Sequence, residues 1–570
     1  MFLSQLPAQR QQRTTVSTFL GYDARPRTPL GAFARMENLT SEGYPTLLVR
    51  RRRKAAAVLR QPHGLAAKDC LIWVDGSTLY INGASVSLPL TSGEKQLVSM
   101  GAYLLIWPDK KYVNTQDLSD AGSLENRVET SGTVDFSLCR ADGSPLGDYT
   151  TGVTPPADPA EGDLWLDTGS GAALLQYDGA IWQAVSGTAM QITATGIGKG
   201  FSAGDSVTVS GCTGAEADGE WTLLTCSDNA ITIGAVSAVS GRQTTPVTVS
   251  REVPDMDFVV ECGNRLWGCK YGIVNGQSIN AVYGSALGDF RNWNTFSGVS
   301  TDSYAADRGS DGAFTGAAAY LGTVLFFKEH SVERLYISAA GAHQITSLQC
   351  PGVKRGSSRS LAVVDGTLYF HGDGGVYAFD GSMPRLVSAA FGEQRYENAV
   401  GGAVEGQYWL SVRQNGAAHL FVYDTGRQLW HRQDDLRVTQ FAAWDGVLYG
   451  LTAQGITAMY GGGAADEPQL HWWAETGDLG LTVPEQKYLQ RIDLRLLPEA
   501  GAWVKAYLSY DEGRTWAYAG GLEGGARQLR AGLLAVRPVR CPHLRLRLEG
   551  GGGCRLYSLS AVYGEGSDLP

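Results

Sequence analysis

Histidine, cysteine and carboxylate side chains do most of the nucleophilic, acid, base and metal chemistry of proteins, and this chain arranges few of them suitably. Its 8 His are scattered, with no H-E-x-x-H and no His near a recognisable nucleophile turn. Its 9 Cys are an odd number without a C-x-x-C pair, which predicts free thiols in a reducing compartment. Asp163, Asp167 and Asp178 lack the alternating spacing of a calcium loop. We therefore expect no catalytic residue, no metal and no cofactor, and predict that the chain is not an enzyme.

The sharpest enzyme-like signal is Ser509 to Trp516, which follows the order S-x-D-x-G-x-x-W and resembles the Asp box of sialidases. In that family the box is a structural turn repeated on propeller blades, and catalysis needs three Arg and a Tyr/Glu pair. Here the motif occurs once, so we interpret it as a hairpin that Asp511 caps and under which Trp516 packs. A glycosidase also needs two carboxylates about 5 to 9.5 Å apart, and no motif nominates such a pair.

A basic run stands out in an otherwise acidic chain. It consists of Arg50, Arg51, Arg52, Arg53 and Lys54. The run could face DNA or an acidic neighbouring subunit, or it could be a solvated loop before the first blade, and the residues alone do not separate these interpretations.

The segment before this run is predicted to be an extended arm. Tyr22 and Arg25 lie in a stretch whose conformation Pro26 and Pro29 restrict. Because such an arm gains little by packing on its own chain, we expect it to lie across a neighbouring subunit, with Tyr22 and Arg25 as assembly contacts. The exposed turn around Trp293 is a further assembly candidate.

Three aromatic residues in the middle of the chain suggest a second kind of site. Trp165, Tyr177 and Trp182 could stack sugar rings and bind glycan on a host surface. The alternative interpretation is that they form the core of a small hairpin motif.

A repeated sequence motif indicates the fold that positions these residues. Asp365 to Tyr369, Glu405 to Trp409 and Asp445 to Tyr449 each read as a turn followed by an apolar strand, 40 residues apart. Two paired strands plus flanking strands per ~40 residues are typical of a propeller blade. Looser copies upstream predict an all-β protein built on a β-propeller of six to eight blades, with seven the best estimate. The spacing of only 25 between Gly76 and Gly101 leaves open that these two turns share a blade.

Composition shifts along the chain divide it into five parts. We expect an extended N-terminal arm at 1–60, the first blades at 61–135, inserted small β modules at 136–252, the remaining blades at 253–464 and a C-terminal β-sandwich at 465–570. The sandwich is predicted from strands such as Ile492 to Leu496 and Leu544 to Leu548, which alternate apolar and charged residues.

Charge and hydropathy narrow the function classes. A net charge of −10 argues against a general nucleic-acid binder, which needs a basic face. No apolar run approaches ~18 residues, so we expect no membrane insertion and synthesis in a cytoplasm.

Several stretches resemble tail proteins of bacterial viruses and prophages, including the tail nozzle, or packaged-DNA stabilisation protein, of short-tailed phages. They are Phe19 to Asp23 with Gly31 to Pro45, Gly101 to Lys111, Gly284 to Trp293 with its D-x-x-N-W turn, and Arg537 to Cys541 continuing through Ser558. The likeness covers most of the chain except the insertion.

This resemblance implies a virion protein of the tail or neck, a homo-oligomer with a hexameric ring as the expected state. Its partners would be the portal, the adaptor and other tail proteins, with packaged DNA passing through the channel until ejection. The ring would be assembled in the bacterial host cytoplasm. The alternative function is a tail-tip receptor-binding protein that recognises host-surface glycan through the inserted module.

Overall fold

The computed structural model describes residues 11–169, 173–234, 241–337, 342–463, 465–480, 486–524, 530–535 and 539–565. Arg537 and Pro538, which carry part of the phage-like resemblance, lie outside the described residues. The described residues form strands and two short 3-10 helices, η1 (Ser358–Ser360) and η2 (Ala389–Phe391). No helix in this part of the chain is long and apolar enough to cross a bilayer.

The chain divides into two compact units, and each is described by itself. The first takes in Met1–Glu94, Phe326–Glu333 and Ser347–Pro570, and the second takes in Lys95–Leu325 and Arg334–Thr346. The C-terminal sandwich belongs to the first unit and the inserted module to the second.

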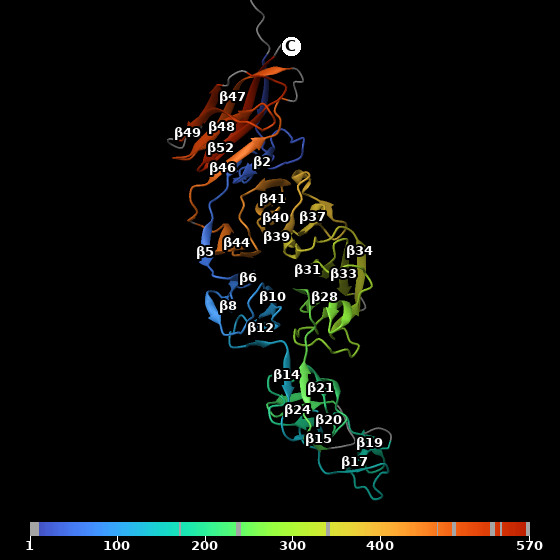
Figure 1. The fold of residues 1–570 in the computed structure, drawn as a ribbon. Coiled ribbons are helices and arrows are strands. Elements are labelled where there is room, and N and C mark those ends of the chain that lie inside the picture. The colour runs from blue at the N-terminus through green and yellow to red at the C-terminus, as the bar shows by residue number, and fades with distance from the viewer. Residues whose placement is uncertain are drawn as a thin grey trace, which may run out of the picture. The chain divides into compact units, whose positions relative to one another are not determined.

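Seven four-stranded antiparallel sheets in the described residues are the blades of a β-propeller, which confirms the predicted fold (Figure 1). In chain order they are β6-β7-β8-β9 (Pro62–Ala67, Leu71–Asp75, Thr78–Ile81, Ala84–Val86), β10-β11-β12-β13 (Gln96–Met100, Tyr103–Trp107, Lys111–Asn114, Ala121–Ser123), β27-β28-β29-β30 (Phe258–Glu261, Leu266–Val274, Gln277–Gly284, Tyr304–Asp307), β31-β32-β33-β34 (Gly316–Tyr320, Thr323–Phe327, Ser331–Ile337, His343–Gln349), β35-β36-β37-β38 (Ala362–Val364, Thr367–Gly372, Gly375–Phe379, Arg385–Leu386), β39-β40-β41-β42 (Glu397–Val404, Gln407–Gln414, Ala417–Asp424, Leu429–Arg432) and β43-β44-β45-β5 (Gln440–Trp444, Val447–Thr452, Gly455–Tyr460, Lys54–Val58).

The 40-residue repeat marks the tight turn between the first two strands of a blade. Asp365 and Gly366 have φ of 47° and 77°, and Asp445 and Gly446 have 49° and 71°. Positive φ at both central residues is the mark of a two-residue type I′ hairpin, which explains why Gly recurs there. Gly76 lies in the turn between β7 and β8, whereas Gly101 lies between β10 and β11, so these two anchors belong to different blades.

The last blade is completed by a strand from the start of the chain. β5 pairs antiparallel with β45, so that Val58 lies opposite Gly455 and Ala57 opposite Ile456. Without β5 the outer edge of β45 would present unpaired backbone groups.

Replacing Gly455 with alanine is expected to loosen this closing strand. A Cβ at Gly455, whose φ is +130°, would stand 2.2 Å from the Ala57 carbonyl oxygen and 2.7 Å from the Leu59 nitrogen. The matched control is Gly446→Ala, because Gly446 has φ of +71° but a Cβ added there would meet no atom within 4 Å. We expect the control to lose about 1 kcal/mol from backbone strain and Gly455→Ala at least about 1 kcal/mol more. Equal denaturant midpoints for the two variants would contradict this.

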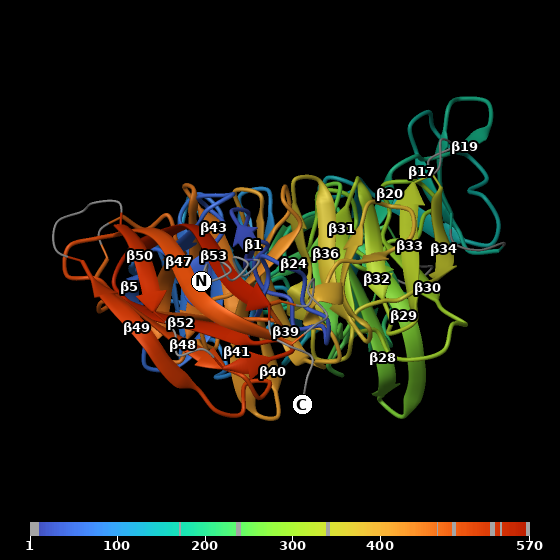
Figure 2. The same ribbon diagram turned by 90° about the horizontal axis from the view of Figure 1, so that it is seen from above.

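In the part of the C-terminal sandwich that the structure describes, two sheets form two layers (Figure 2). One has the order β3-β4-β53-β47-β50 (Leu39–Thr40, Leu47–Val49, Cys554–Glu565, Lys487–Pro498, Arg530–Ala535), with β1 (Gln11–Val16) on β53 and β51 (Arg540–Cys541) on β47. The other has the order β2-β46-β52-β48-β49 (Phe33–Glu37, His471–Thr476, Arg545–Gly551, Trp503–Ser509, Ala517–Glu523).

The N-terminal segment is therefore not the extended arm that the sequence predicted. Its strands β1 to β4 are built into the C-terminal sandwich, where β1 pairs with β53 from Gln11 opposite Gly564 to Val16 opposite Leu559. The segment also buries its aromatic residues, since Phe19 and Phe33 stack with ring centroids 6.0 Å apart. Pairing and burial on its own chain supply the stabilisation that the prediction assigned to a neighbouring subunit.

The described residues of the inserted module form three sheets. They are β14-β26-β21-β22 (Asn126–Glu129, Thr248–Arg251, Ser206–Ser210, Gly219–Thr222), β23-β24-β20-β15-β25 (Thr225–Ser227, Ala230–Ile233, Thr188–Thr193, Val134–Arg140, Arg242–Gln243) and β16-β17-β18-β19 (Tyr149–Gly152, Leu164–Asp167, Ala173–Tyr177, Trp182–Ala184). A core of its own includes Phe136, Ile192, Val207 and Ile231.

Candidate functional site

The predicted basic run is divided between the interior and the surface. The Arg50 and Arg53 side chains are 5% exposed, whereas Arg51 is 73% exposed. Arg50 pairs with Asp434 at 3.1 Å and with Glu467 at 2.8 Å, and Arg53 pairs with Asp434 at 2.6 Å. Arg52 is exposed and donates to the Glu467 carbonyl oxygen. The run is thus not one DNA-facing patch, because two of its four guanidinium groups are neutralised inside the protein.

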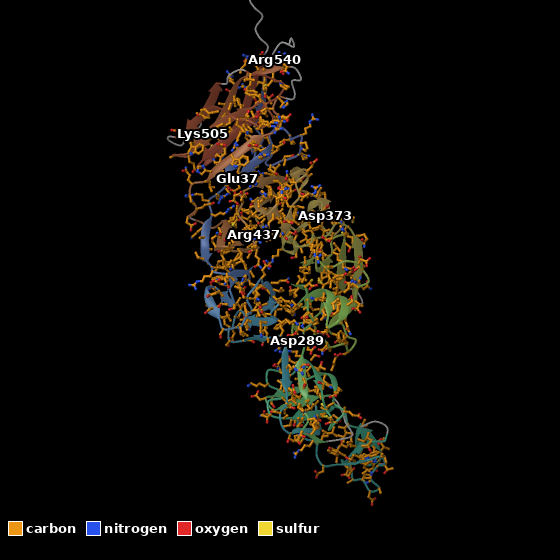
Figure 3. All side chains as sticks on the ribbon, viewed as in Figure 1. Glu37, Asp289, Asp373, Arg437, Lys505 and Arg540 are labelled. Atoms are coloured by element: carbon orange, nitrogen blue, oxygen red, sulfur yellow. The ribbon has the colours of Figure 1, made fainter. Side chains whose placement is uncertain are left out.

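A second ion pair also links the N-terminal segment to the propeller. It involves Glu37, which Figure 3 labels near the base of the sandwich. Its carboxylate accepts hydrogen bonds from Arg432 at 2.8 Å and from the Trp473 indole nitrogen at 3.2 Å. Burial lowers the pKa of Arg53, and although burial of Asp434 acts to raise the pKa of that carboxyl, Arg53 and Arg50 hold it below its usual value. The ion pairs of Glu37, Arg50 and Arg53 therefore hold the N-terminal segment against β42 and the loop after it.

Tyr22 and Arg25 do not present an assembly surface as predicted. Tyr22 is buried, with its ring 5.5 Å from that of Phe421, and burial raises its pKa. Its backbone nitrogen donates to the Trp430 carbonyl oxygen at 2.6 Å. Arg25, with a side chain 48% exposed, is occupied by an ion pair with Asp23. Tyr22 is therefore a core residue that attaches the N-terminal segment to the β39–β42 blade.

Trp293 is likewise buried, although the turn that carries it is exposed in part. Its indole nitrogen donates to the Phe290 carbonyl oxygen at 2.9 Å, and Asp289 (Figure 3) accepts from the Arg291 nitrogen at 2.9 Å. The buried Arg265 braces the following loop by donating to the carbonyl oxygens of Ser285, Ser300 and Asp302. The D-x-x-N-W motif is therefore a rigid structural turn.

The three glycan candidates contact one another. The rings of Trp165 and Trp182 lie 5.4 Å apart and those of Tyr177 and Trp182 lie 5.3 Å apart. Trp165 is 6% exposed and its indole nitrogen donates to the Gly152 carbonyl oxygen. These contacts are those of a hairpin core, which was the alternative interpretation, while Tyr177 and Trp182 are half-buried.

A Ser–His pair occurs in the β35–β38 region, but it is inaccessible. Ser357 Oγ lies 3.3 Å from His371 Nδ1, and the two residues are 0% and 3% exposed. Burial lowers the pKa of His371 to about 4. No group of three or more His, Cys, Asp or Glu side chains suited to a metal ion occurs among the described residues.

The Asp box forms the structural turn that its sequence indicated. Asp511 accepts hydrogen bonds from the Thr515 nitrogen at 2.9 Å, from Thr515 Oγ1 at 2.6 Å and from Ser509 Oγ at 2.7 Å. These bonds stabilise the carboxylate, and the bonds from Thr515 contribute most to lowering its pKa to about 2.

Replacing Asp511 with alanine is expected to open this hairpin, because three donors lose their acceptor. Trypsin cleavage after Arg514, which the turn presents, should then become faster than in the native protein. The control is Glu512→Gln, since Glu512 is exposed and the exchange preserves its shape. Identical digestion of both variants would show that the hydrogen bonds do not hold the turn.

The described residues also contain an open hollow of about 780 Å³ within the second unit. Its walls are the β28–β29 hairpin, β21 and β22 of the inserted module, and the two crossings between blade and module near residues 125–127 and 250–255. At its edge Lys110 Nζ contacts Glu125 at 2.6 Å, Asp255 at 2.7 Å and the Val253 carbonyl oxygen at 2.8 Å. The hydrogen bond from Lys110 lowers the pKa of Asp255. Sequence reasoning missed this hollow because its walls come from separate segments without a shared motif.

No protein-family model matches the chain, and no curated protein matches it. Solved structures with similarity include an exo-β-1,3-galactanase from Phanerochaete chrysosporium, 9% identical, covering 53% of this chain and 94% of that one with a TM-score of 0.20. PorZ, a surface component of the type-IX secretion system of Porphyromonas gingivalis, is 12% identical, with coverage of 88% and 81% and a TM-score of 0.26. A family 43 arabinoxylan arabinofuranohydrolase from Bacillus subtilis is 11% identical, with coverage of 88% and 95% and a TM-score of 0.18.

The prediction that the chain is not an enzyme is wrong as an exclusion, because glycoside hydrolases stand among these similar structures. Propellers serve many functions, catalysis included, and a missing sequence motif does not remove that possibility. At these identities the likeness concerns the fold alone, and the substrates of those enzymes are properties of those enzymes.

Proposed function

We propose that this protein is a structural component of a bacteriophage tail or neck, which assembles into a ring and surrounds the path of the packaged DNA. The observation that carries the proposal is the integration of the N-terminal segment into both halves of the first unit. Residues 11–49 complete the sandwich and residues 54–58 complete the last blade. A part that retains a genome under pressure benefits from such interlocking, because β1 and β5 cannot be pulled away without breaking a sheet.

The residues of the phage-like resemblance support the proposal, because they form rigid parts of the fold. Gly31 to Pro45 contributes β2 and β3, Gly101 to Lys111 covers β11 with the turns on either side of it, and Gly284 to Trp293 is the turn braced by Arg265. These are positions that could maintain the geometry of a ring interface.

Charge supports a passage for DNA in preference to a DNA-binding surface. The protein has a net charge of −10, and the run that could have bound phosphates places Arg50 and Arg53 in buried ion pairs. An acidic surface repels DNA and lets it slide.

The test is mass photometry of the purified full chain, alone and mixed with the portal and adaptor proteins encoded beside it. We expect a closed ring that docks on this connector. A monomer or trimer that ignores the connector would overturn the proposal and favour a tail-tip receptor-binding protein, the alternative function.

A further inference from the structure

The hollow of about 780 Å³ has the size and position of a small-molecule site. Ligand sites are commonly clefts of roughly 300 to 1,000 Å³ at the junction of two structural parts. This hollow lies where the inserted module joins the β27–β30 blade, and both belong to the second unit.

One wall is an extended two-stranded ribbon. β28 and β29 pair from Trp267 opposite Gly284 to Val274 opposite Gln277, while β27 covers β28 only up to Cys269. Because side chains alternate across a strand, Val274, Ile279 and Tyr283 share one face, and all three line the hollow. Tyr271 and Ile273 lie on the opposite face and are 41% and 78% exposed. The ribbon thus offers the hollow a continuous apolar strip.

The opposite walls are fixed before any ligand arrives. Arg251 donates to the carbonyl oxygens of Leu124 and Ser123 and pairs with the buried Asp205, which ties the outgoing crossing to the returning one. Lys110 joins Glu125 to Asp255 across the same two crossings. A hollow with tied walls loses little conformational entropy when a ligand binds.

The polar groups that line the hollow without an ion-pair partner in the described part of the chain include both charge signs as well as neutral groups. Arg127, Glu220 and Glu252 are exposed and make no ion pair with other described residues. Thr208, Ser250 and Asn275 add hydroxyl and amide groups that both donate and accept hydrogen bonds.

This lining discriminates among classes of ligand. A fully apolar ligand would strip water from carboxylates without replacing it. A nucleic acid would meet more carboxylates than cations. A polyhydroxylated ring suits the lining, because its hydroxyl groups donate to carboxylates and accept from guanidinium and amide groups, while its C–H face packs on an apolar strip.

We propose that this hollow binds a short oligosaccharide, with Glu220 and Glu252 accepting hydrogen bonds from its hydroxyl groups and the Ile279–Tyr283 strip contacting a ring face. The site differs from the aromatic cluster at Trp182 that the sequence suggested. It does not depend on ring assembly.

The experiment is an array of defined bacterial-surface oligosaccharides probed with the purified full chain, followed by calorimetric titration of the strongest ligand. The double variant Glu220→Gln/Glu252→Gln should weaken binding about tenfold or more, since each exchange replaces a charged acceptor. Thr208→Trp, which fills the hollow, should abolish binding. The matched control is Glu129→Gln, because Glu129 is exposed on β14 and does not line the hollow.

Thermal unfolding of all four proteins shows whether the variants fold. A native protein that binds no oligosaccharide, or an affinity that Glu220→Gln/Glu252→Gln and Thr208→Trp leave unchanged, would overturn the proposal. If the native protein bound hexalysine and no oligosaccharide, the ligand would be a cationic peptide, and the assignment of the hollow to oligosaccharides would be overturned. Mass photometry of the same samples reports ring assembly separately, so failure of the ring and failure of this site are distinguishable.

Discussion

Replacing Asp434 with alanine is expected to lower the free energy of unfolding by about 3 to 5 kcal/mol, since it leaves two buried guanidinium groups without their shared partner. Asp434 Oδ2 lies 3.1 Å from Arg50 Nη2 and 2.6 Å from Arg53 Nη1, and both side chains are 5% exposed. Glu467 remains beside Arg50, but it reaches Arg53 only at its backbone nitrogen. The unpaired Arg53 guanidinium group therefore accounts for most of the decrease in the free energy of unfolding.

The neighbouring residue provides the control for this variant. Asp435 has a side chain 68% exposed and pairs with Arg432, so it is also an acid beside an arginine. Because Asp435 is exposed and Arg432 keeps its ion pair with Glu37, Asp435→Ala should lose no more than about 1 kcal/mol. Guanidinium unfolding monitored by tryptophan fluorescence measures both. Similar losses for the two variants would mean that burial does not decide the strength of this cluster.

The propeller could be predicted because its signal is local. A Gly after an acidic residue, two residues between strands and a strand on each side recur within each 40-residue copy, as at Asp365 and Asp445. The sandwich alternation was equally local: Ile492, Leu494 and Leu496 are buried while Arg495 between them is exposed.

The parts that the sequence did not predict depend on partners far along the chain. Arg13 pairs with Asp493, 480 residues away, and Arg50 pairs with Glu467, 417 residues away. A strand as short as β3 shows no alternation of apolar and polar residues that a sequence pattern could reveal. The sequence also does not show which of the four consecutive arginines form buried ion pairs. The hollow could not be predicted for the same reason: Lys110, Glu220 and Tyr283 are far apart in the sequence and come together only in the fold.

Acidification is expected to destabilise the first unit through two buried histidines before its carboxylates titrate. Burial lowers the pKa of His371 and of His431 to about 4, and both side chains are nearly inaccessible. The Gly21 backbone packs closely against His431, since a Cβ added to Gly21 would stand 2.9 Å from its Nε2. Protonation in place would put a charge into a closed setting, where the loss of hydration disfavours it.

The direction follows from proton uptake. An unfolded histidine has a pKa of about 6.5, so between pH 6.5 and 4 the unfolded chain binds more protons than the folded one. The stabilising effect of the neutral folded form is complete above about pH 6.5 and is lost as the pH falls toward 4. Each histidine then lowers the free energy of unfolding by roughly 1.4 kcal/mol per pH unit, which gives about 4 kcal/mol for both between pH 7 and 5.

Denaturant unfolding of the native protein, His371→Gln, His431→Gln and the double variant His371→Gln/His431→Gln at pH 9, 7, 6 and 5 measures this effect. Each single variant should lose about half of the slope between pH 7 and 5, and the double variant nearly all of it. Between pH 9 and 7 the histidines are mostly neutral in both states, so the variants and the native protein should run nearly parallel there. A native slope between pH 7 and 5 that survives in the double variant would assign the acid sensitivity to other groups and would mean that these two imidazoles accept protons without unfolding the blades that hold them.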